Sequence, residues 1–203
     1  MIVDITQVTR IGKEYRDGSA PLKVEKVTRK SKSGSSYSTI NFSCDVHNMG
    51  THIDVMSAEA YVSEDRLVAE GIKFDVSHIT DREVTLEDLD LSIVKEGVYV
   101  FFQTNWDKYL EDDEKYNNHP DISFSVIEYL ASKNVNMIGI DALGLAKGRM
   151  HGEIDRFLGK EGKYSIENLT NLDRIPESNF KVYCLPIKVE GIDAWPARVL
   201  VEF

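Results

Sequence analysis

Two histidines and an aspartate that could bind a metal ion stand within eight residues of each other in the stretch Cys44–Tyr61, as His47, His52 and Asp54. Side chains two residues apart on an extended strand project from one face, so His52 and Asp54 could hold one ion together. Imidazole and carboxylate ligands suit zinc, and they suit manganese or iron nearly as well. Gly50 would allow the backbone to bend before the pair. A surface pair on a strand is the alternative that this pattern alone leaves open.

Two residues later in the chain could complete such a metal centre. His151 follows a polar, glycine-containing loop, and Glu167 lies between apolar residues, where a carboxylate needs a partner. A carboxylate between two histidines could bridge two ions, and such a pair activates water and polarises a carbonyl. The sequence contains no serine-nucleophile elbow, no phosphate-binding loop and no Cys-x-x-Cys motif that would favour another chemistry.

Length and composition predict one globular domain over residues 1–203. The chain is 42% hydrophobic and 9% aromatic, which is enough for one sizeable core, and it shows no internal repeat. No apolar run is long enough for a membrane span, and the first residues lack the pattern of a signal peptide. We therefore expect a cytoplasmic protein that does not bind membranes, with Cys44 and Cys184 in the reduced state.

The charge balance disfavours nucleic-acid binding as the main activity. The sequence has 24 basic and 34 acidic residues, a net charge of −10, which would repel a phosphate backbone. The basic run Lys23–Ser38 is the exception. Its alternation and its Ser/Gly-rich centre predict a solvated hairpin, and a nucleic-acid contact through this run is the weaker alternative.

The elements that must position the candidate ligands follow from the hydrophobic pattern. The first third of the chain reads as β-strands, followed by a possible short helix over residues 62–72. Residues 97–106 and 135–143 are apolar runs typical of strands buried on both faces, and residues 121–134 form an amphipathic helix between them. Strand, helix and strand in this order predict a parallel βαβ unit with ligand sites at the carboxyl ends of the strands. The fold class is mixed α/β.

Ordered segments along most of the chain carry a family resemblance. They include GTHID, VFFQTNW, NNHPDIS before a helix, VNMIGID, IENLTNLDRIP and the closing CLPIKVEGIDAWPARVLVEF. With these segments the chain resembles the cyclase-type metal-dependent hydrolases, the family that contains bacterial kynurenine formamidase, an arylformamidase. The resemblance implies a single domain of the swivelling β/β/α type, with a mixed β-sheet and packed helices. It also implies a homodimer or a higher homo-oligomer.

The family pattern in the first segment is His-x-Gly-Thr-His-x-Asp-x-Pro-x-His. On this sequence its second histidine matches His52 and its aspartate matches Asp54, while the later family ligands, a histidine and a bridging glutamate, match His151 and Glu167. The resemblance thus implies that these four residues bind one or two ions of zinc or manganese. Asp54 and Glu167 would serve catalysis by holding the ions that activate water.

This sequence departs from the family pattern at two histidines. The first family histidine falls on Asn48, with His47 immediately before it, and the final one, which family members use as the acid/base, falls on Ala58. His47 could replace the first ligand if a bulge turned it to the other face of the strand, since neighbouring strand residues point oppositely. An alanine cannot move a proton, a contribution worth about 10²–10⁴-fold in rate. Glu59, His47 or metal-bound hydroxide could substitute.

Two aromatic residues are candidates for substrate binding. Tyr15 matches the aromatic that the family's N-terminal loop contributes to the substrate pocket, and Trp106 ends a buried strand, where it could line a pocket for a planar molecule or simply pack in the core. His119 precedes a helix entry and is expected to be structural.

The function we expect is hydrolysis of a carbon–nitrogen bond in a small amide or cyclic amide. Arylformamides are the reference substrates by resemblance, which places the chain in tryptophan catabolism. The alternative is a catalytically impaired family member that binds a small molecule or a partner, and it rests on the residues at positions 48 and 58.

Overall fold

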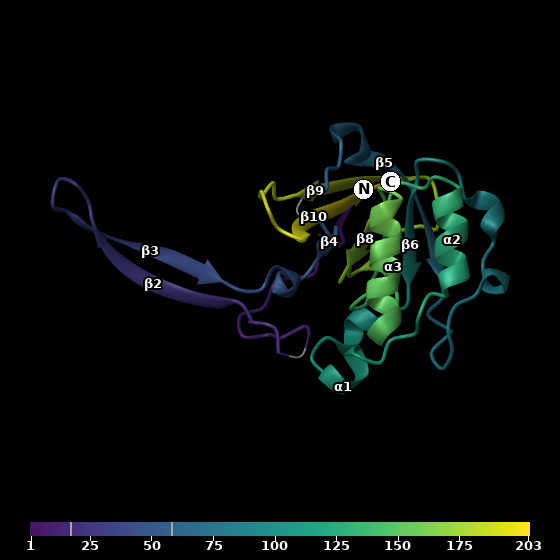
Figure 1. The fold of residues 1–203 in the computed structure, drawn as a ribbon, viewed down its shortest axis with the longest axis horizontal. Coiled ribbons are helices and arrows are strands. Elements are labelled where there is room, and N and C mark those ends of the chain that lie inside the picture. Colours follow the sequence, from purple (N-terminus) through teal and green to yellow (C-terminus); the bar gives the residue numbers. More distant parts are fainter. Residues whose placement is uncertain (17, 58) are drawn as a thin grey trace.

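The fold is built around a sheet that curls into a barrel, with two longer helices on one side and a long hairpin that projects away from it (Figure 1). The computed structural model describes residues 1–16, 18–57 and 59–203. The strands are β1 (Ile2–Asp4), β2 (Lys23–Lys30), β3 (Ser36–Ser43), β4 (His52–Asp54), β5 (Val68–Asp75), β6 (Tyr99–Gln103), β7 (Ile138–Ile140), β8 (Ser165–Glu167), β9 (Phe180–Pro186) and β10 (Ala194–Glu202). The helices are α1 (Asp113–Tyr116), α2 (Phe124–Ser132) and α3 (Gly148–Lys160).

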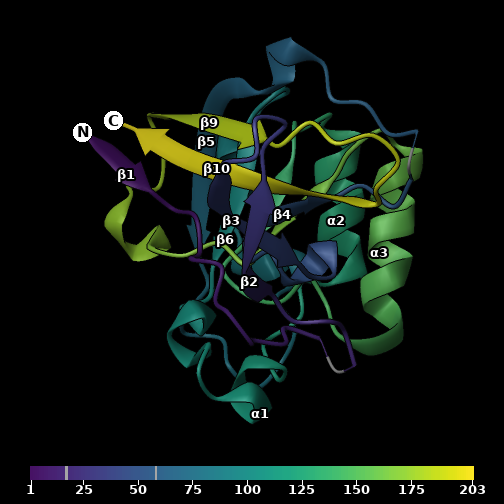
Figure 2. The same ribbon diagram turned by 90° about the vertical axis from the view of Figure 1, so that its left-hand side faces the viewer.

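The main sheet is mixed and closes on itself. Its strands follow the order β1-β10-β4-β8-β7-β6-β5-β9, and β9 pairs again with β10 to complete the ring. Neighbours from β8 through β5 are parallel, whereas β4 and β10 are antiparallel to their neighbours. The predicted mixed α/β class is confirmed. The expectation of packed helices is confirmed only in part, because the two longer helices, α2 and α3, pack together on one side of the barrel only (Figure 2).

Strand β6 is apolar on both faces because each face packs against a separate core cluster. Tyr99 and Phe101 point into the barrel, where they pack in one core cluster, and Val100 and Phe102 pack in a second cluster under the helices. All of these side chains are fully buried. A strand with core on either side needs a continuous apolar run, as the pattern predicted.

The predicted βαβ unit is confirmed as β6, α2 and β7, with β6 and β7 parallel. Helix α2 buries Val126, Ile127 and Leu130 toward the sheet. Beyond the ends of the two strands, the Asp141 carboxylate accepts hydrogen bonds from the backbone N–H of Thr104 at 2.8 Å and of Asn105 at 2.8 Å. These hydrogen bonds join the two strand ends. Burial raises the pKa of Asp141 to about 7, although the hydrogen bonds act to lower it.

The helix considered for residues 62–72 is wrong for most of that segment. A short 3-10 turn at Glu64–Arg66 leads directly into β5, which pairs with β6 on one edge and β9 on the other. Gly71 lies under the ring of Phe180, and a Cβ there would approach Phe180 Cε2 to 2.2 Å. Pairing on both edges and close packing therefore override the local helical preference. No helix in the described ranges is long and apolar enough to cross a membrane.

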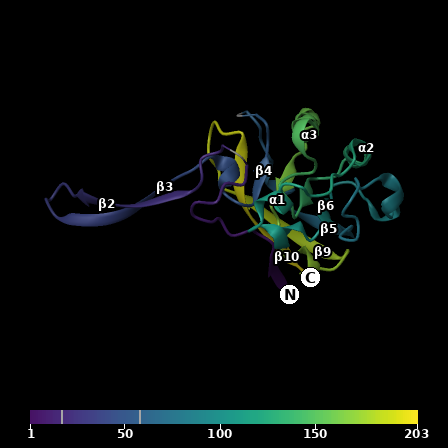
Figure 3. The same cartoon turned by 90° about the horizontal axis from the view of Figure 1, so that it is seen from below.

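The predicted basic hairpin is present as β2 and β3, which pair in register from Lys23 with Ser43 to Lys30 with Ser36. It extends far from the barrel in two perpendicular views (Figures 1 and 3). Most of its side chains are exposed to solvent, as the sequence predicted.

Candidate metal centre

The pairing of β4 with β8 brings the first candidate ligands together. His52 lies directly opposite Glu167 in the antiparallel register, so both side chains are on one face, and His52 Nε2 is 3.5 Å from Glu167 Oε2. Asp54 follows on the same face of β4, as the spacing of two residues predicted. His52 and Glu167 are each 1% exposed and Asp54 is 3% exposed. These residues form a buried cluster, and the surface pair considered from the sequence does not occur.

Helix α3 supplies the next two side chains, His151 and Asp155, one helical turn apart. His151 Nε2 is 3.3 Å from Asp155 Oδ2 and 3.7 Å from Glu167 Oε1. Asp54, His151, Asp155 and Glu167 form a group whose ligand atoms all lie within 4.8 Å of one another. Gly144 makes room for the ring, because a Cβ at that position would approach His151 Nδ1 to 2.4 Å.

Asp155 was missed in the sequence. Its signal is the spacing His-x-x-x-Asp, which places both side chains on the same face once residues 148–160 are assigned to a helix. The sequence GLAKGRMH, which ends at His151, reads as a loop because it contains two glycines. In the structure Gly148 begins the helix with φ +57°, a conformation that glycine adopts freely.

His47 faces the centre from a second direction. It belongs to the 3-10 turn Val46–Asn48, so the alternation of strand side chains does not apply, and the expected bulge is not needed. His47 Nε2 is 3.7 Å from Asp54 Oδ2, and the ligand atoms of His47, His52 and Asp54 also lie within 4.8 Å of one another. Asp54 therefore belongs to both groups.

Asn48 is directed away from the centre. Its side chain is fully buried, where its Oδ1 accepts from the Tyr15 backbone N–H at 2.9 Å and its Nδ2 donates to the Ala20 carbonyl at 2.7 Å. Its Nδ2 also donates to Ser19 Oγ at 2.9 Å. Of the two residues left open by the sequence, His47 is the one that faces the candidate ligands.

The hydrogen bonds of buried His52 and half-buried His151 fix which ring nitrogen of each carries the hydrogen. Nδ1 of His52 is 2.9 Å from the Gly50 carbonyl, and Nδ1 of His151 is 3.1 Å from the Ala146 carbonyl. Because a carbonyl oxygen can only accept, both Nδ1 atoms carry the hydrogen and both Nε2 atoms present a lone pair. Histidines that bind metals are held in this way by a carbonyl or carboxylate behind the ring.

Several buried polar atoms of this cluster have no hydrogen-bond partner among the described residues. They are His52 Nε2, Asp54 Oδ1, Asp155 Oδ2 and Glu167 Oε1. Leaving such atoms unpaired is costly, and three carboxylates in one buried space repel each other. A divalent cation would satisfy the nitrogen and the oxygens at once, so the donor set fits a metal ion.

The pKa values of the cluster reflect burial without a cation. Burial, together with the charges of Asp155 and Asp54, raises the pKa of Glu167 well above its ordinary value. Burial and the charge of Asp54 raise the pKa of Asp155 to about 7. Burial lowers the pKa of His52 to about 4, so this ring is neutral at pH 7 and can act as a ligand.

A cavity of about 590 Å³ opens over the cluster. Its walls include the ligand candidates His47, Asp54, His151 and Asp155, and the rest of the lining includes cationic side chains from separate segments, Arg16, Lys147 and Arg156. Buried His119 also lines it, with its Nδ1 3.0 Å from the Pro120 carbonyl. Ala58, the position of the family acid/base, lies outside the described residues.

Neither aromatic candidate for substrate binding is among the described residues that line this cavity. Tyr15 is 2% exposed and packs in the core cluster beneath the helices. Trp106 is in the same cluster, and its Nε1 donates to the Lys115 carbonyl at 2.8 Å. In this chain both residues pack in the core, which for Trp106 was the alternative considered from the sequence.

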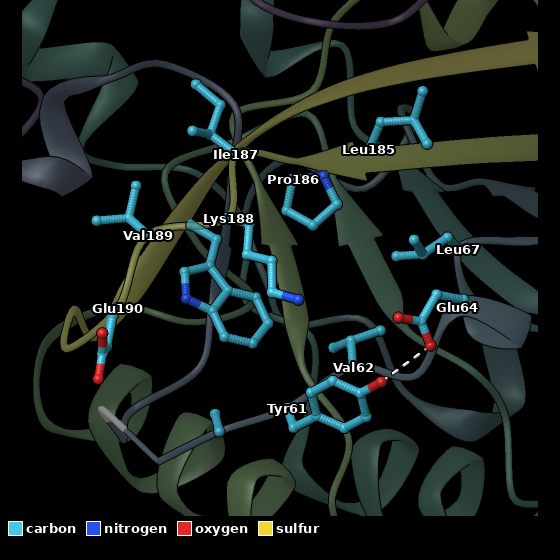
Figure 4. A pocket seen from close by; sticks show the side chains of 12 residues that line it. Tyr61, Val62, Glu64, Leu67, Leu185, Pro186, Ile187, Lys188, Val189 and Glu190 are labelled. Carbon is cyan, nitrogen blue, oxygen red and sulfur yellow. Dashed lines mark hydrogen bonds between the residues drawn. The ribbon is translucent and has the colours of Figure 1, made fainter.

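A separate groove of about 450 Å³ lies between the loop before β5 and the loop that joins β9 to β10 (Figure 4). It is lined mainly by apolar side chains such as Val62, Leu67 and Ile187, and Tyr61 donates a hydrogen bond to Glu64 at its edge. None of the metal-ligand candidates lines it, so the polar chemistry of the molecule is concentrated in the other cavity.

Comparison with known proteins agrees with this geometry. The model of the Cyclase family matches residues 3–147. The chain is 26% identical to kynurenine formamidase from Erythrobacter litoralis over 99% of this chain and 93% of that protein. It is 28% identical to isatin hydrolase from Roseibium aggregatum over 51% of this chain, a match that spans only 44% of that relative. The structure of a predicted metal-dependent hydrolase from Bacillus stearothermophilus aligns with a TM-score of 0.78 and 28% identity, over 99% of this chain and 97% of that one.

Proposed function

We propose that this chain, which belongs to the Cyclase family, is a metal-dependent hydrolase of a carbon–nitrogen bond in a small amide or cyclic amide. The observation that carries the proposal is the group of Asp54, His151, Asp155 and Glu167, whose ligand atoms all lie within 4.8 Å of one another. Each of its three carboxylates has a buried oxygen without a hydrogen-bond partner among the described residues. Kynurenine formamidase and isatin hydrolase, two relatives, are named for a formamide substrate and for a cyclic amide. Arylformamides are accordingly the first substrates to test.

We assign the ligands to two overlapping positions, so that one or two ions of zinc or manganese can bind. His47, His52 and Asp54 would hold one ion, Asp54, His151 and Glu167 would hold the other, and Asp155 lies beside the second position. What a divalent ion supplies in such a site is polarisation of the substrate carbonyl and a lowered pKa of water. Asp54 and Glu167 keep the catalytic role expected of them as ligands, Asp54 in both positions and Glu167 in the second.

The carboxylates of this chain also have to hold the proton that water gives up. Asp155 accepts one hydrogen bond, from Ser165 Oγ at 3.2 Å, and its other oxygen faces the cluster without a partner in the described ranges. It lines the cavity, whereas Glu167 lies deeper. We therefore assign proton transfer between water and the leaving nitrogen to Asp155, in place of the histidine that the family has at position 58.

The metal content of the purified protein tests this function. Protein made without a polyhistidine tag should contain about one to two equivalents of zinc or manganese, and it should hydrolyse formanilide or isatin. Less than about a tenth of an equivalent, with no uptake on adding either ion, would contradict the proposal. Full metal content without hydrolysis of any amide would favour the alternative, a family member that binds a small molecule or a partner.

We further propose a homodimer held by the β2–β3 hairpin. Val24, Ile40 and Phe42 lie on one face of the hairpin, and the side chains of Ile40 and Phe42 are 61% and 65% exposed. A hairpin of two strands is marginally stable alone in water, so a second copy that covers this face would stabilise it. The hairpin is basic and the whole chain has a net charge of −10, which favours contact between the hairpin and another copy's body.

The cytoplasmic location and the place in tryptophan catabolism stay predictions.

Replacing Ile40 and Phe42 together by lysine should dissociate the dimer, because the buried apolar contact is lost and positive charges repel. Light scattering after size exclusion should give twice 23.0 kDa for the natural chain and 23.0 kDa for the variant. The matched control carries lysine at Thr39 and Asn41, which are on the opposite face of the same strand. A natural chain that is monomeric, or a variant that stays dimeric, would contradict this interface.

A further inference from the structure

We propose that the substrate of this site carries a carboxylate close to the amide, and that Arg16 binds it. The inference rests on the proposed hydrolase function and names its substrate class. Arg16 lies in the N-terminal loop, exposed to solvent, and its guanidinium reaches the metal-ligand cluster across the cavity. Arginine suits this role because its planar fork binds a carboxylate with two parallel hydrogen bonds.

The contact of Arg16 places its charge beside the candidate metal position. Arg16 Nη2 donates to His151 Nε2 at 2.9 Å, since Nδ1 of that ring already carries the hydrogen given to the Ala146 carbonyl. The lone pair on Nε2 cannot serve both the guanidinium and a metal ion. A metal ion at His151 would therefore release the guanidinium, which remains attached at the edge of the cluster and needs a new acceptor.

The remaining charges of the cavity wall favour an anion as that acceptor. Beyond the ligand candidates, the charged lining residues among those that the structure describes are Arg16, Lys147 and Arg156, with Asp193 as the one carboxylate. Lys147 is already engaged by Asp121 at 2.8 Å and by the His119 carbonyl. Arg16, by contrast, contacts a candidate ligand of the cluster directly, and its guanidinium can turn to a substrate.

The short distance limits where the carboxylate can be. Because the guanidinium, once released from His151 Nε2, stays beside the metal position, a carboxylate bound to Arg16 would lie close to the polarised carbonyl. This fits an amide with the carboxylate on a neighbouring carbon, as in 2-formamidobenzoate, and excludes one with a distant carboxylate. In the reaction water adds to the formyl carbon, the carbon–nitrogen bond breaks, and the nitrogen takes a proton. Formate and the amine leave, and the carboxylate is unchanged.

A positional series of substrates tests the inference. The metal-loaded protein is assayed with formanilide and with 2-, 3- and 4-formamidobenzoate, which differ only in the carboxylate and its position. We expect kcat/KM for the 2-isomer to exceed that for formanilide and for the 4-isomer by about 10–100-fold, the size of a charge-assisted hydrogen-bond pair. Arg16→Gln should lower the ratio of 2-formamidobenzoate to formanilide by a similar factor, and Arg16→Lys should restore part of it.

Arg10→Gln is the matched control, because Arg10 is on the same segment but pairs with Glu111 at 3.1 Å outside the cavity. It should leave the substrate ratio unchanged. Equal kcat/KM for formanilide and the 2-isomer in the natural protein would overturn the inference and leave the hydrolase function standing.

A binding measurement separates the inference from the function. Calorimetry with the product 2-aminobenzoate and with aniline should show tighter binding of the acid to the metal-loaded protein, by about 10-fold or more. Arg16→Gln should remove this difference. If the protein hydrolyses none of the four amides, the proposed function fails, and the binding result still decides the role of Arg16. Equal binding of acid and aniline, or no effect of Arg16→Gln, would overturn it.

Discussion

Glu167→Gln is expected to abolish tight metal binding and hydrolysis while the fold stays intact. Glu167 is 1% exposed and stands between two histidine nitrogens, 3.5 Å from His52 Nε2 and 3.7 Å from His151 Nε2. Glutamine has the same shape but no charge, so the second metal position loses an anionic ligand. We expect metal affinity to fall by more than about 100-fold, measured by competition with a chelating dye.

The thermal unfolding of the metal-free variant distinguishes this loss from misfolding. Burial already raises the pKa of the Glu167 carboxylate, because a charge is unfavourable in this site, and glutamine places a neutral amide there. The melting temperature of the metal-free variant should therefore be equal to or above that of the natural chain. Glu161→Gln is the matched control, because Glu161 is exposed at the end of α3 and should have no effect on either property. Retention of full metal affinity by Glu167→Gln would show that the ligands are assigned wrongly.

The metal-free protein is expected to lose stability as the pH rises from about 6.5 to 8, while its affinity for metal increases. Burial raises the pKa of Asp155 to about 7 and that of Glu167 well above its ordinary value. The folded state thus binds these protons more tightly than the unfolded state, and the stability this gives is lost as pH rises through the folded values. The buried His52, with a pKa of about 4, acts in the opposite sense only below about pH 6.5.

Melting curves at several pH values, with a chelator or with zinc, measure this linkage. Zinc displaces the same protons, so the gain in melting temperature on adding it should grow with pH. Asp155→Asn cannot ionise, and it should flatten the decline of the metal-free protein between about pH 6.5 and 8. A melting temperature that rises over this range without metal would contradict the assignment of buried, protonated carboxylates.

Local patterns were enough to predict those parts of the fold that depend on near neighbours. The apolar runs around β6 and β7 and the amphipathic α2 gave a correct βαβ unit, because each signal lies within one segment. The shared face of His52 and Asp54 followed from the strand period alone. The closing of the sheet by β9 and β10 carried no such signal, since it depends on pairing between strands that each also pair elsewhere.

The rest of the metal centre depended on contacts that the sequence does not specify. The direction of His47 is set by a 3-10 turn, which a strand pattern cannot predict. Asp155 joins the centre only because α3 begins before His151 and lies against β8. Tyr15 and Trp106 pack in the core cluster beneath the helices, through contacts between distant segments that local patterns do not specify.

The hydrogen bonds of Asn48 connect position 48, where the family pattern has a histidine, to the loop that carries Arg16. Its amide fastens the backbone of Tyr15 and Ala20, the two sides of the loop that carries Arg16. A histidine at position 48 has no amide to make both hydrogen bonds, so Asn48→His would also loosen the loop that presents the guanidinium. Position 48 of this chain thus serves the placement of Arg16, so a change there would alter substrate binding together with the metal centre.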